Sequence, residues 1–391
     1  MRVAVIAGFA PSLVNFRGEL LREMVALGHT VLALAPERDE GVIAKLGEYG
    51  VAFEQVPLVR AGLNPLADLR TLAAITRTLR RFRAEVTLAY TAKPVIYGTL
   101  AARLAGVRTR CAMITGVGSS LRATSGARAL VSAAMRGLYA VALRSANVVL
   151  FQNPDDEALF RRLNLLGPAQ RVVLVDGSGV DLQRFAARPL PSERGPTFLL
   201  VGRLLRDKGV VEFVEASRLV RRTHPQARFV VVGGRDSNPS CITEAELARW
   251  RAEGLVEFLG PQPDVAPHLA ACHVFVLPSY GEGMPRSTLE ALATGRPIVT
   301  TDVPGCRETV RADDNGLLVP ARDAPALAKA MAQLAGAERA VLVRMSAQSR
   351  LLAEERFDVR KVNRAVLRAM GLSLGEPSGH GPSGSMVGGR R

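Results

Sequence analysis

The sequence has few of the residues that build metal centres and disulfide frameworks. Among its 391 residues, four are cysteine and five are histidine, and the cysteines lack the CxxC spacing of zinc sites and redox motifs. There is no Asp-x-Asp pair, and no cluster of histidine, aspartate and glutamate has metal-ligand spacing. We therefore expect no metal ion and no cofactor, and we interpret the cysteines as small buried residues.

Long apolar runs and aromatic residues are also scarce. No apolar stretch is long enough to cross a bilayer, and residues 3–7 are too short for a signal peptide, so we expect a cytoplasmic protein. Aromatic residues make up only 5% of the chain, which leaves few stacking platforms for single-stranded nucleic acid. Because the common nucleic-acid-binding signatures are missing as well, we expect no nucleic-acid partner.

Positive charge is what the chain has in excess. Fifty-one basic and 36 acidic residues give a formal net charge of +15, which favours a phosphorylated ligand or an anionic phospholipid surface. Residues 66–83 and 121–144 set arginines among Leu, Ala and Val, as a helix at a membrane interface does. An ordinary packed amphipathic helix has the same pattern. Peripheral attachment to the inner face of the plasma membrane is therefore a hypothesis.

Short apolar runs alternate with helical patterns almost from end to end. This alternation predicts an α/β fold with two doubly wound, Rossmann-like parallel-sheet domains that face one cleft. We predict a first domain at 1–176, a linker at 177–196, a second domain at 197–356, a helix crossing back at 357–371 and a disordered tail at 372–391. The expected strands are 3–7, 30–34, 51–55, 86–90, 109–114, 147–151 and 171–175, then 198–202, 228–233, 257–259, 273–277, 297–300 and 316–319.

The most informative segment is PSYGEGMPRSTLEALATGRPIV, residues 278–299. It follows an apolar run, passes a Gly-rich corner and enters a helical pattern, which predicts a strand, a tight loop and a helix. With Pro285 at the first helical position, the amides of Arg286, Ser287 and Thr288 are expected to be unpaired. Together with the positive end of the helix dipole, they would form an anion site.

Two glutamates bracket this corner. Glu290, about a turn and a half inside the helix, is placed to accept both hydroxyls of a ribose, and Glu282 would face whatever lies beyond the phosphate. Gly281 and Gly283 let the backbone approach a ligand. The segment therefore predicts a nucleotide-sugar site, although a plain strand-to-helix turn with a surface carboxylate fits these residues equally well.

Other loops after predicted strands add cations and polar groups. The loop VGRLLRDKG places Arg203 and Lys208 at the carboxyl edge of a sheet, where two cations would neutralise a diphosphate; surface cations at a helix start are the alternative. On the opposing wall, Gly8 ends the first strand and Lys93 precedes the helix-opening Pro94. We predict that Gly8 and Lys93 face the substrate, while a tight turn and a solvated loop edge explain them as well.

Taken together, these blocks resemble the retaining glycosyltransferases of family four, which have the two-domain GT-B architecture. The resemblance covers nearly the whole chain and is most specific in the E-x7-E segment and in VGRLLRDKG. Other blocks, including SLVNFRGEL, YTAKPVIYG, MITGVGSS, FQNPDDEALF and GSGVDLQRF, look like bacterial enzymes that build polysaccharide or glycan precursors on polyprenyl diphosphate. Such enzymes include N-acetylgalactosaminyltransferases that act on undecaprenyl-diphosphate-linked diacetylbacillosamine.

This resemblance implies a retaining, metal-independent hexosyltransferase with a UDP-sugar donor and a polyprenyl-diphosphate-linked or other glycan acceptor. It implies catalytic roles for Glu282 at the donor sugar and for Arg203 and Lys208 at the diphosphate. The implied substrate-binding residues are Glu290 at the ribose, the amides of Gly283, Met284, Arg286 and Ser287, and, in the first domain, Gly8 and Lys93.

Two departures from the family pattern matter. Many relatives carry a histidine near the donor sugar where this chain has Lys93 or the MITGVGSS loop, which leaves the acceptor-side chemistry open. Many also have Gly where Pro285 stands, so the chain loses one amide from the donor site.

Two other functions remain as alternatives. A sugar-nucleotide epimerase of the same architecture would bind the same donor without transferring its sugar. A non-catalytic nucleotide-sugar or membrane-binding protein would bind the donor without releasing UDP. A dinucleotide-binding oxidoreductase is disfavoured, because GxGxxG is missing after the first predicted strand.

Overall fold

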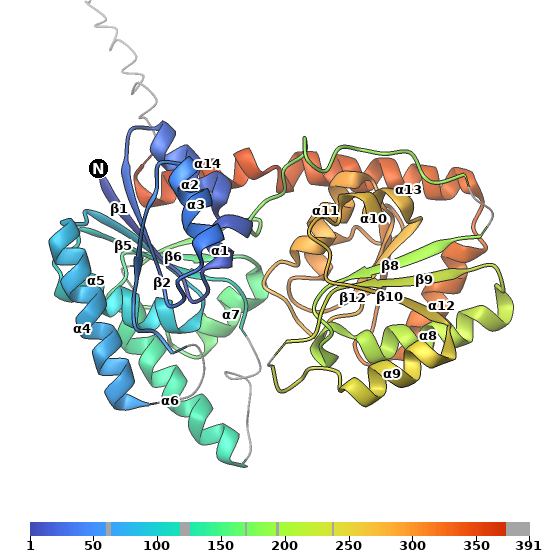
Figure 1. Cartoon of the computed structure of the whole chain (residues 1–391), viewed down its shortest axis with the longest axis horizontal. Helices are drawn as coiled ribbons and strands as arrows, with labels where there is room; N and C mark the ends of the chain where they lie inside the picture. Colours follow the sequence, from blue (N-terminus) through green and yellow to red (C-terminus); the bar gives the residue numbers. More distant parts are fainter. Residues whose placement is uncertain (60–63, 118–125, 169, 193–194, 237, 373–391) are drawn as a thin grey trace, which may run out of the picture.

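Two parallel β-sheets, each covered by helices, make up the computed structural model (Figure 1). The structure describes residues 1–59, 64–117, 126–168, 170–192, 195–236 and 238–372. The first sheet has seven strands in the order β3-β2-β1-β4-β5-β6-β7, and the second has six in the order β10-β9-β8-β11-β12-β13. Neighbouring strands are parallel throughout both sheets. The predicted α/β fold with two doubly wound sheets is confirmed.

Each predicted apolar run forms a strand, with ends shifted by one residue at most sites. The strands of the first sheet are β1 (Arg2–Ile6), β2 (Thr30–Ala35), β3 (Ala52–Gln55), β4 (Val86–Tyr90), β5 (Thr109–Ile114), β6 (Val148–Phe151) and β7 (Arg171–Leu174). Those of the second sheet are β8 (Thr197–Val201), β9 (Arg228–Val232), β10 (Val256–Gly260), β11 (Val274–Leu277), β12 (Ile298–Thr301) and β13 (Gly316–Val319).

Helices connect the strands on both sides of each sheet. Those of the first half are α1 (Pro11–Asn15), α2 (Gly18–Ala26), α3 (Glu40–Glu48), α4 (Pro65–Phe82), the π-helix η1 (Pro94–Gly98), α5 (Thr99–Leu104), α6 (Gly126–Leu143) and α7 (Pro154–Arg162). Those of the second half are η3 (Arg206–Lys208), α8 (Val210–Thr223), α9 (Glu244–Glu253), α10 (Ala266–Ala271), α11 (Arg286–Thr294), η4 (Arg307–Thr309), α12 (Ala324–Ala335), α13 (Arg339–Leu352) and η5 (Ala353–Phe357). The last helix, α14 (Val359–Met370), returns to the first half.

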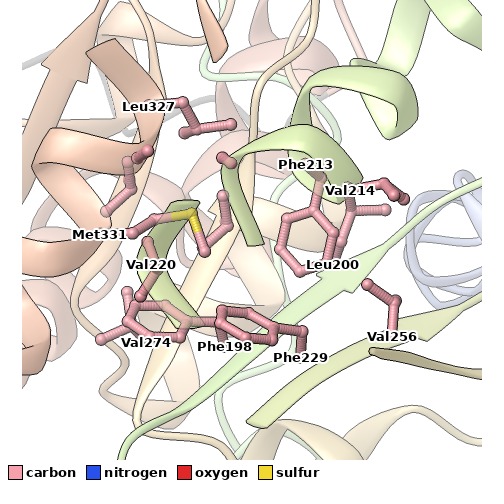
Figure 2. Packing of buried hydrophobic residues seen from close by; sticks show 14 of the residues in the cluster. Phe198, Leu200, Phe213, Val214, Val220, Phe229, Val256, Val274, Leu327 and Met331 are labelled. Atoms are coloured by element: carbon pink, nitrogen blue, oxygen red, sulfur yellow. The ribbon is translucent and has the colours of Figure 1, made fainter. Parts of the chain in front are cut away.

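The core of the second half explains why its strands consist of consecutive apolar residues. Phe198 of β8 and Phe229 of β9 stack with ring centroids 5.7 Å apart, and Phe213 of α8 meets Phe229 edge-on at 6.4 Å (Figure 2). Leu327 and Met331 of α12 join the same buried cluster. Because α8 and α12 bury this face while other helices cover the opposite one, the central strands need apolar residues at consecutive positions.

Strand order also decides where loops converge. Strand β1 lies beside β4 and strand β8 beside β11, so in each sheet the connections depart in opposite directions from this pair. Ligands of doubly wound sheets bind beyond the carboxyl ends of the strands at such a switch point. The predicted loops at Gly8, Lys93, Arg203–Lys208 and 278–285 all follow these four strands.

The two passages of the chain between the halves are bonded to each other. The amide of Val180 donates to the carbonyl of Phe357 at 2.7 Å, and the amide of Val359 donates back to the carbonyl of Val180 at 3.0 Å. Helix α14 then places Val366 and Leu367 in the core of the first sheet and lies beside α2 (Figure 1). The limits 176, 196 and 356 given above remain predictions.

Arg296, just before β12, fixes the connection to the second sheet. Its side chain is completely buried, and its guanidinium donates to the carbonyls of Cys272 at 3.0 Å and of Pro189 and Thr294 at 3.2 Å. It also donates to the carbonyl of Arg188. The cation is therefore compensated by carbonyl dipoles, two of them from the segment 177–196.

We predict that Arg296→Met lowers the free energy of unfolding by about 2–4 kcal/mol, because buried carbonyls lose a charged donor. Urea unfolding measures this change. Arg344→Met on α13, which removes an exposed arginine, is the control and is expected to change stability by less than about 0.5 kcal/mol. Equal stability of the Arg296 and Arg344 variants would contradict the anchoring role.

Candidate active site

The corner between β11 and α11 forms as the sequence predicts, with two corrections. Pro285 has extended backbone angles and is the N-cap of α11, so Arg286 and not Pro285 is the first helical residue. Its carbonyl accepts the amides of Thr288 at 3.0 Å and Leu289 at 3.2 Å, so the prediction of an unpaired Thr288 amide was wrong. The amides of Arg286 and Ser287 precede the first intrahelical bond, so they remain the predicted donors of an anion site.

Lys208 and Glu282 lie together, although 74 positions separate them in the chain. The Lys208 ammonium is 2.5 Å from Glu282 Oε1, and the Ser279 hydroxyl donates to the same oxygen at 2.8 Å. The pairing follows from the neighbouring strands, because the amide of Tyr280 bonds to the carbonyl of Asp207 and ties the loop after β11 to the loop after β8. Sequence reasoning did not identify Ser279, whose only signal is its place at a strand end.

Arg203 lies in the same loop as Lys208 but has a different partner. Its guanidinium pairs with Asp236 at 2.5 Å, and more than half of the side chain is exposed. The structure therefore brings Lys208 and Glu282 into contact and leaves Arg203 paired at the edge of the neighbouring loop. Since this pair is solvent-exposed, it holds Arg203 only weakly.

Glu290 is buried inside α11 and bonded to the residue one turn earlier. Arg286 Nε donates to Glu290 Oε1 at 2.8 Å. Burial raises the pKa of Glu290 above that of an ordinary glutamate, and the charge and hydrogen bond of Arg286 lower it in part. The Arg286 guanidinium also lies 5.4 Å from the centroid of the Phe16 ring, which belongs to the first half. Both halves therefore contribute to the surroundings of this carboxylate.

The first half touches the Gly-rich corner through its backbone. A Cβ on Gly283 would lie 2.1 Å from the carbonyl oxygen of Thr115, and one on Gly116 would lie 2.9 Å from the amide nitrogen of Gly283. Asn153, the N-cap of α7, donates to the carbonyl of Gly283 at 2.8 Å. Only glycine fits at 283, so the predicted close approach at this residue is to the opposite half of the protein.

The sequence did not predict Asn153 as a site residue. Its Asn-Pro sequence is typical of a helix start, and its side-chain oxygen does accept the amide of Asp156 at 2.8 Å. The additional bond from Nδ2 to Gly283 depends on the packing of the two halves, which no local pattern reveals.

Gly8 and Lys93 lie beyond β1 and β4 on the first wall. A Cβ on Gly8 would be 2.7 Å from the Thr91 hydroxyl, so the two loops are in contact. Lys93 is only 7% exposed and pairs with Asp68 of α4 at 2.9 Å, with its ammonium 5.9 Å from the centroid of the Tyr97 ring. Its charge is already compensated inside the first half. Met284, from the opposite wall, packs its side chain against Gly177.

Two family models match most of the chain. A "Glycosyl transferase 4-like domain" matches residues 14–177, and "Glycosyl transferases group 1" matches residues 195–336. These matches, together with the two parallel-sheet halves, define a glycosyltransferase of GT-B architecture. The chain belongs to glycosyltransferase family four, as its resemblance implied.

Curated relatives match over much of their length. The chain is 29% identical over 369 residues to the Campylobacter jejuni N,N'-diacetylbacillosaminyl-diphospho-undecaprenol alpha-1,3-N-acetylgalactosaminyltransferase, covering 91% of this chain and 95% of the relative. It is 27% identical to the Escherichia coli UDP-Gal:alpha-D-GlcNAc-diphosphoundecaprenol alpha-1,3-galactosyltransferase, covering 71% and 73%. The prediction of a glycosyltransferase enzyme is confirmed, while retention and metal independence stay predictions.

Solved structures share the fold. Anabaena HepE in complex with UDP superposes with a TM-score of 0.75 at 18% identity, covering 95% of this chain and 100% of that one. Sucrose-phosphate synthase from Thermosynechococcus elongatus gives the same TM-score at 20% identity, covering 94% and 98%. In the described part of this chain, no helix combines the length and apolar character of a membrane span.

Proposed function

We propose that this protein is a retaining, metal-independent glycosyltransferase that moves a hexose or N-acetylhexosamine from a UDP-sugar to a polyprenyl-diphosphate-linked glycan acceptor. The reaction would belong to cell-surface polysaccharide or glycan biosynthesis. The observation that carries the proposal is the Lys208–Glu282 contact in the loop before α11, eight positions ahead of the buried Glu290 in that helix. The names of the Campylobacter and Escherichia relatives support the donor and acceptor classes.

Each part of the UDP-sugar would be bound by different residues. Glu290 would accept the ribose hydroxyls, and the amides of Arg286 and Ser287 would meet the diphosphate. Lys208, with Arg203 after release from Asp236, would neutralise the departing phosphate. Glu282 and the amides of Gly283 and Met284 would contact the sugar.

Retention without a carboxylate nucleophile fits attack from the same face as the departing group. The bond from the sugar's anomeric carbon to the β-phosphate oxygen breaks as the acceptor hydroxyl forms its own bond to that carbon. The hydroxyl proton passes to the leaving phosphate oxygen. The protein's part is to stabilise the negative charge that grows on that phosphate, through Lys208 and the first amides of α11.

Acceptor-dependent release of UDP tests this function. With a panel of UDP-sugars and a membrane lipid extract, we expect UDP release and sugar incorporation into lipid only when donor and acceptor are both present. Conversion of the UDP-sugar to its epimer without acceptor would favour the epimerase alternative. Donor binding without UDP release for every UDP-sugar would favour a binding protein.

The cation pair at the diphosphate gives a second prediction. We expect Arg203→Ala with Lys208→Ala to lower kcat by about 100-fold or more, because an interaction that strengthens in the transition state is lost. Thermal midpoints measured beside steady-state rates should stay near the wild-type value. Arg206→Ala, in the same loop but paired with Glu246, is the matched control and should keep normal turnover. A folded and fully active double variant would refute the diphosphate clamp.

We also propose that α4 and α5 bind the anionic surface that carries the lipid acceptor. Leu66 and Leu69 are 71% and 62% exposed on α4, although they begin a helix whose other face is packed against the sheet. Beside them, a groove of about 510 Å³ is lined by leucines and by Arg77 and Arg80. Exposed leucines flanked by arginines match acyl chains below anionic headgroups. Residues 121–125 of the other basic stretch lie outside the described residues.

Flotation with vesicles tests this surface. We expect binding to phosphatidylglycerol vesicles at low salt, release at high salt, and no binding to phosphatidylcholine alone. Arg70→Glu with Arg77→Glu should weaken binding on the order of tenfold or more, whereas Arg249→Glu with Arg251→Glu on α9 makes the same charge change elsewhere and should not. Equal binding by both double variants would reject the α4 surface.

A further inference from the structure

Arg17 is a buried cation to which the proposed reaction assigns no role. It is the N-cap of α2 and is only 4% exposed. Its guanidinium lies over Tyr90 at the end of β4, 5.3 Å from the ring centroid, and one nitrogen is 2.8 Å from the sulfur of Met113 in β5. The side chain therefore sits at the carboxyl edge of the first sheet, beside the switch point.

The contacts of Arg17 do not satisfy its charge. A guanidinium has five N–H donors, and a thioether sulfur is a weak acceptor. Its Nε is buried without a partner, and within the described residues no carboxylate pairs with the group. Burial lowers the pKa of Arg17 to about 10, so the group stays charged at neutral pH. A buried cation left in this state is costly to the fold.

Arg296 shows that this situation is not a general property of the fold. That arginine is completely buried and its Nε also lacks a partner, yet its two terminal nitrogens donate to backbone carbonyls. Removal of Arg296 takes donors away from the protein itself. Removal of Arg17 would take a donor from one sulfur atom and a cation from the face of the Tyr90 ring, and among the described residues it would leave no backbone carbonyl without its donor.

A second cation approaches Arg17 from the opposite half. The charge of Arg286 is among the causes that lower the pKa of Arg17, after burial. Arg286 also stacks on Phe16, the residue before Arg17. Glu290 compensates Arg286 but not Arg17. Two guanidinium groups close enough to influence one another, one from each half, favour an anion between them.

We propose that Arg17 binds a phosphate oxygen of a substrate diphosphate, which replaces the sulfur of Met113 as its acceptor. The proposal rests on the function proposed above, because both the UDP-sugar and the polyprenyl-linked acceptor carry a diphosphate. The planar guanidinium can donate two parallel bonds to one phosphate group. Arg17 is then a binding residue of the first half that complements the α11 amides of the second.

Calorimetry with two probes distinguishes the two sources. UDP is titrated into the free protein, and inorganic pyrophosphate into the protein saturated with UDP. We expect Arg17→Met to raise the Kd of either UDP or pyrophosphate on the order of tenfold or more, since a charged hydrogen bond is lost. Weaker UDP binding assigns Arg17 to the donor, and weaker pyrophosphate binding at saturating UDP assigns it to the acceptor. Arg22→Met, on the exposed side of α2, is the matched control and should bind both like wild type.

Thermal midpoints separate this role from a structural one. If Arg17 binds substrate, Arg17→Met should be at least as stable as wild type, because an unsatisfied buried charge is removed. If the methionine variant fails to fold, Arg17→Lys keeps the charge without the planar fork and should still weaken binding. Unchanged binding of both probes by a folded Arg17 variant would overturn the proposal.

The outcome for Arg17 is independent of the transfer assay. Loss of diphosphate binding in Arg17→Met, in a protein that transfers no sugar with any donor and acceptor, would refute the proposed function and keep this site. Sugar transfer by the folded Arg17→Met variant with normal KM for donor and acceptor would refute the Arg17 site and keep the proposed function.

Discussion

The backbone contact between the loop after β5 and the Gly-rich corner after β11 fixes the geometry of that corner. Gly283 meets Thr115 so closely that a single methyl group would collide with it, and Asn153, 130 positions earlier in the chain, holds the Gly283 carbonyl. Because that carbonyl is held by the first half, the orientation of the peptide that joins Gly283 to Met284 is set from across the cleft. The geometry of the Gly-rich corner is therefore not a property of the second sheet alone. Its geometry exists only when the two halves are together, which couples closure of the cleft to completion of the site.

Two cations beside the Gly-rich corner are already paired with acids. Lys208 pairs with Glu282 and Arg286 with Glu290, so each cation near the α11 N-terminus already has an acid. Such pairs hold side chains in position, but they supply little net charge to attract a diphosphate. Net attraction must then come from the first amides of α11 and from a cation without an acid. Arg17 is such a cation. Its hydrogen bond goes to a sulfur atom, whereas the bonds of Arg296 go to backbone carbonyls. We therefore assign the charge of Arg17 to a ligand and the charge of Arg296 to the stability of the fold.

The sequence was sufficient for the fold and for part of the site, and the reasons differ. Parallel strands buried on both faces leave apolar runs that are visible without any partner, which explains why every expected strand is present. The E-x7-E corner was readable because a strand, a glycine turn and a helix are local features. Pro285 was misplaced by one position, since cap and first turn differ only in backbone angles. Lys93 could not be judged, because its partner Asp68 lies on another helix, and Asn153 and Arg17 are defined by contacts between segments far apart in the chain.

Closure of the cleft must be reversible if a lipid-linked acceptor is to enter. The two chain passages are bonded to each other at Val180, Phe357 and Val359, and thus form one narrow pivot rather than two separate tethers. Away from this pivot, the ion pair of Arg307 with Asp155 also joins the halves, but both side chains are more than a third exposed, and such pairs contribute little. The Asn153 bond to Gly283 is buried and directional, and it is lost as soon as the corner moves away. Among the described contacts named above, separation of the halves would break the Asn153 bond and the Arg307–Asp155 pair, and a diphosphate held between Arg17 and the α11 amides would add contacts that favour the closed state.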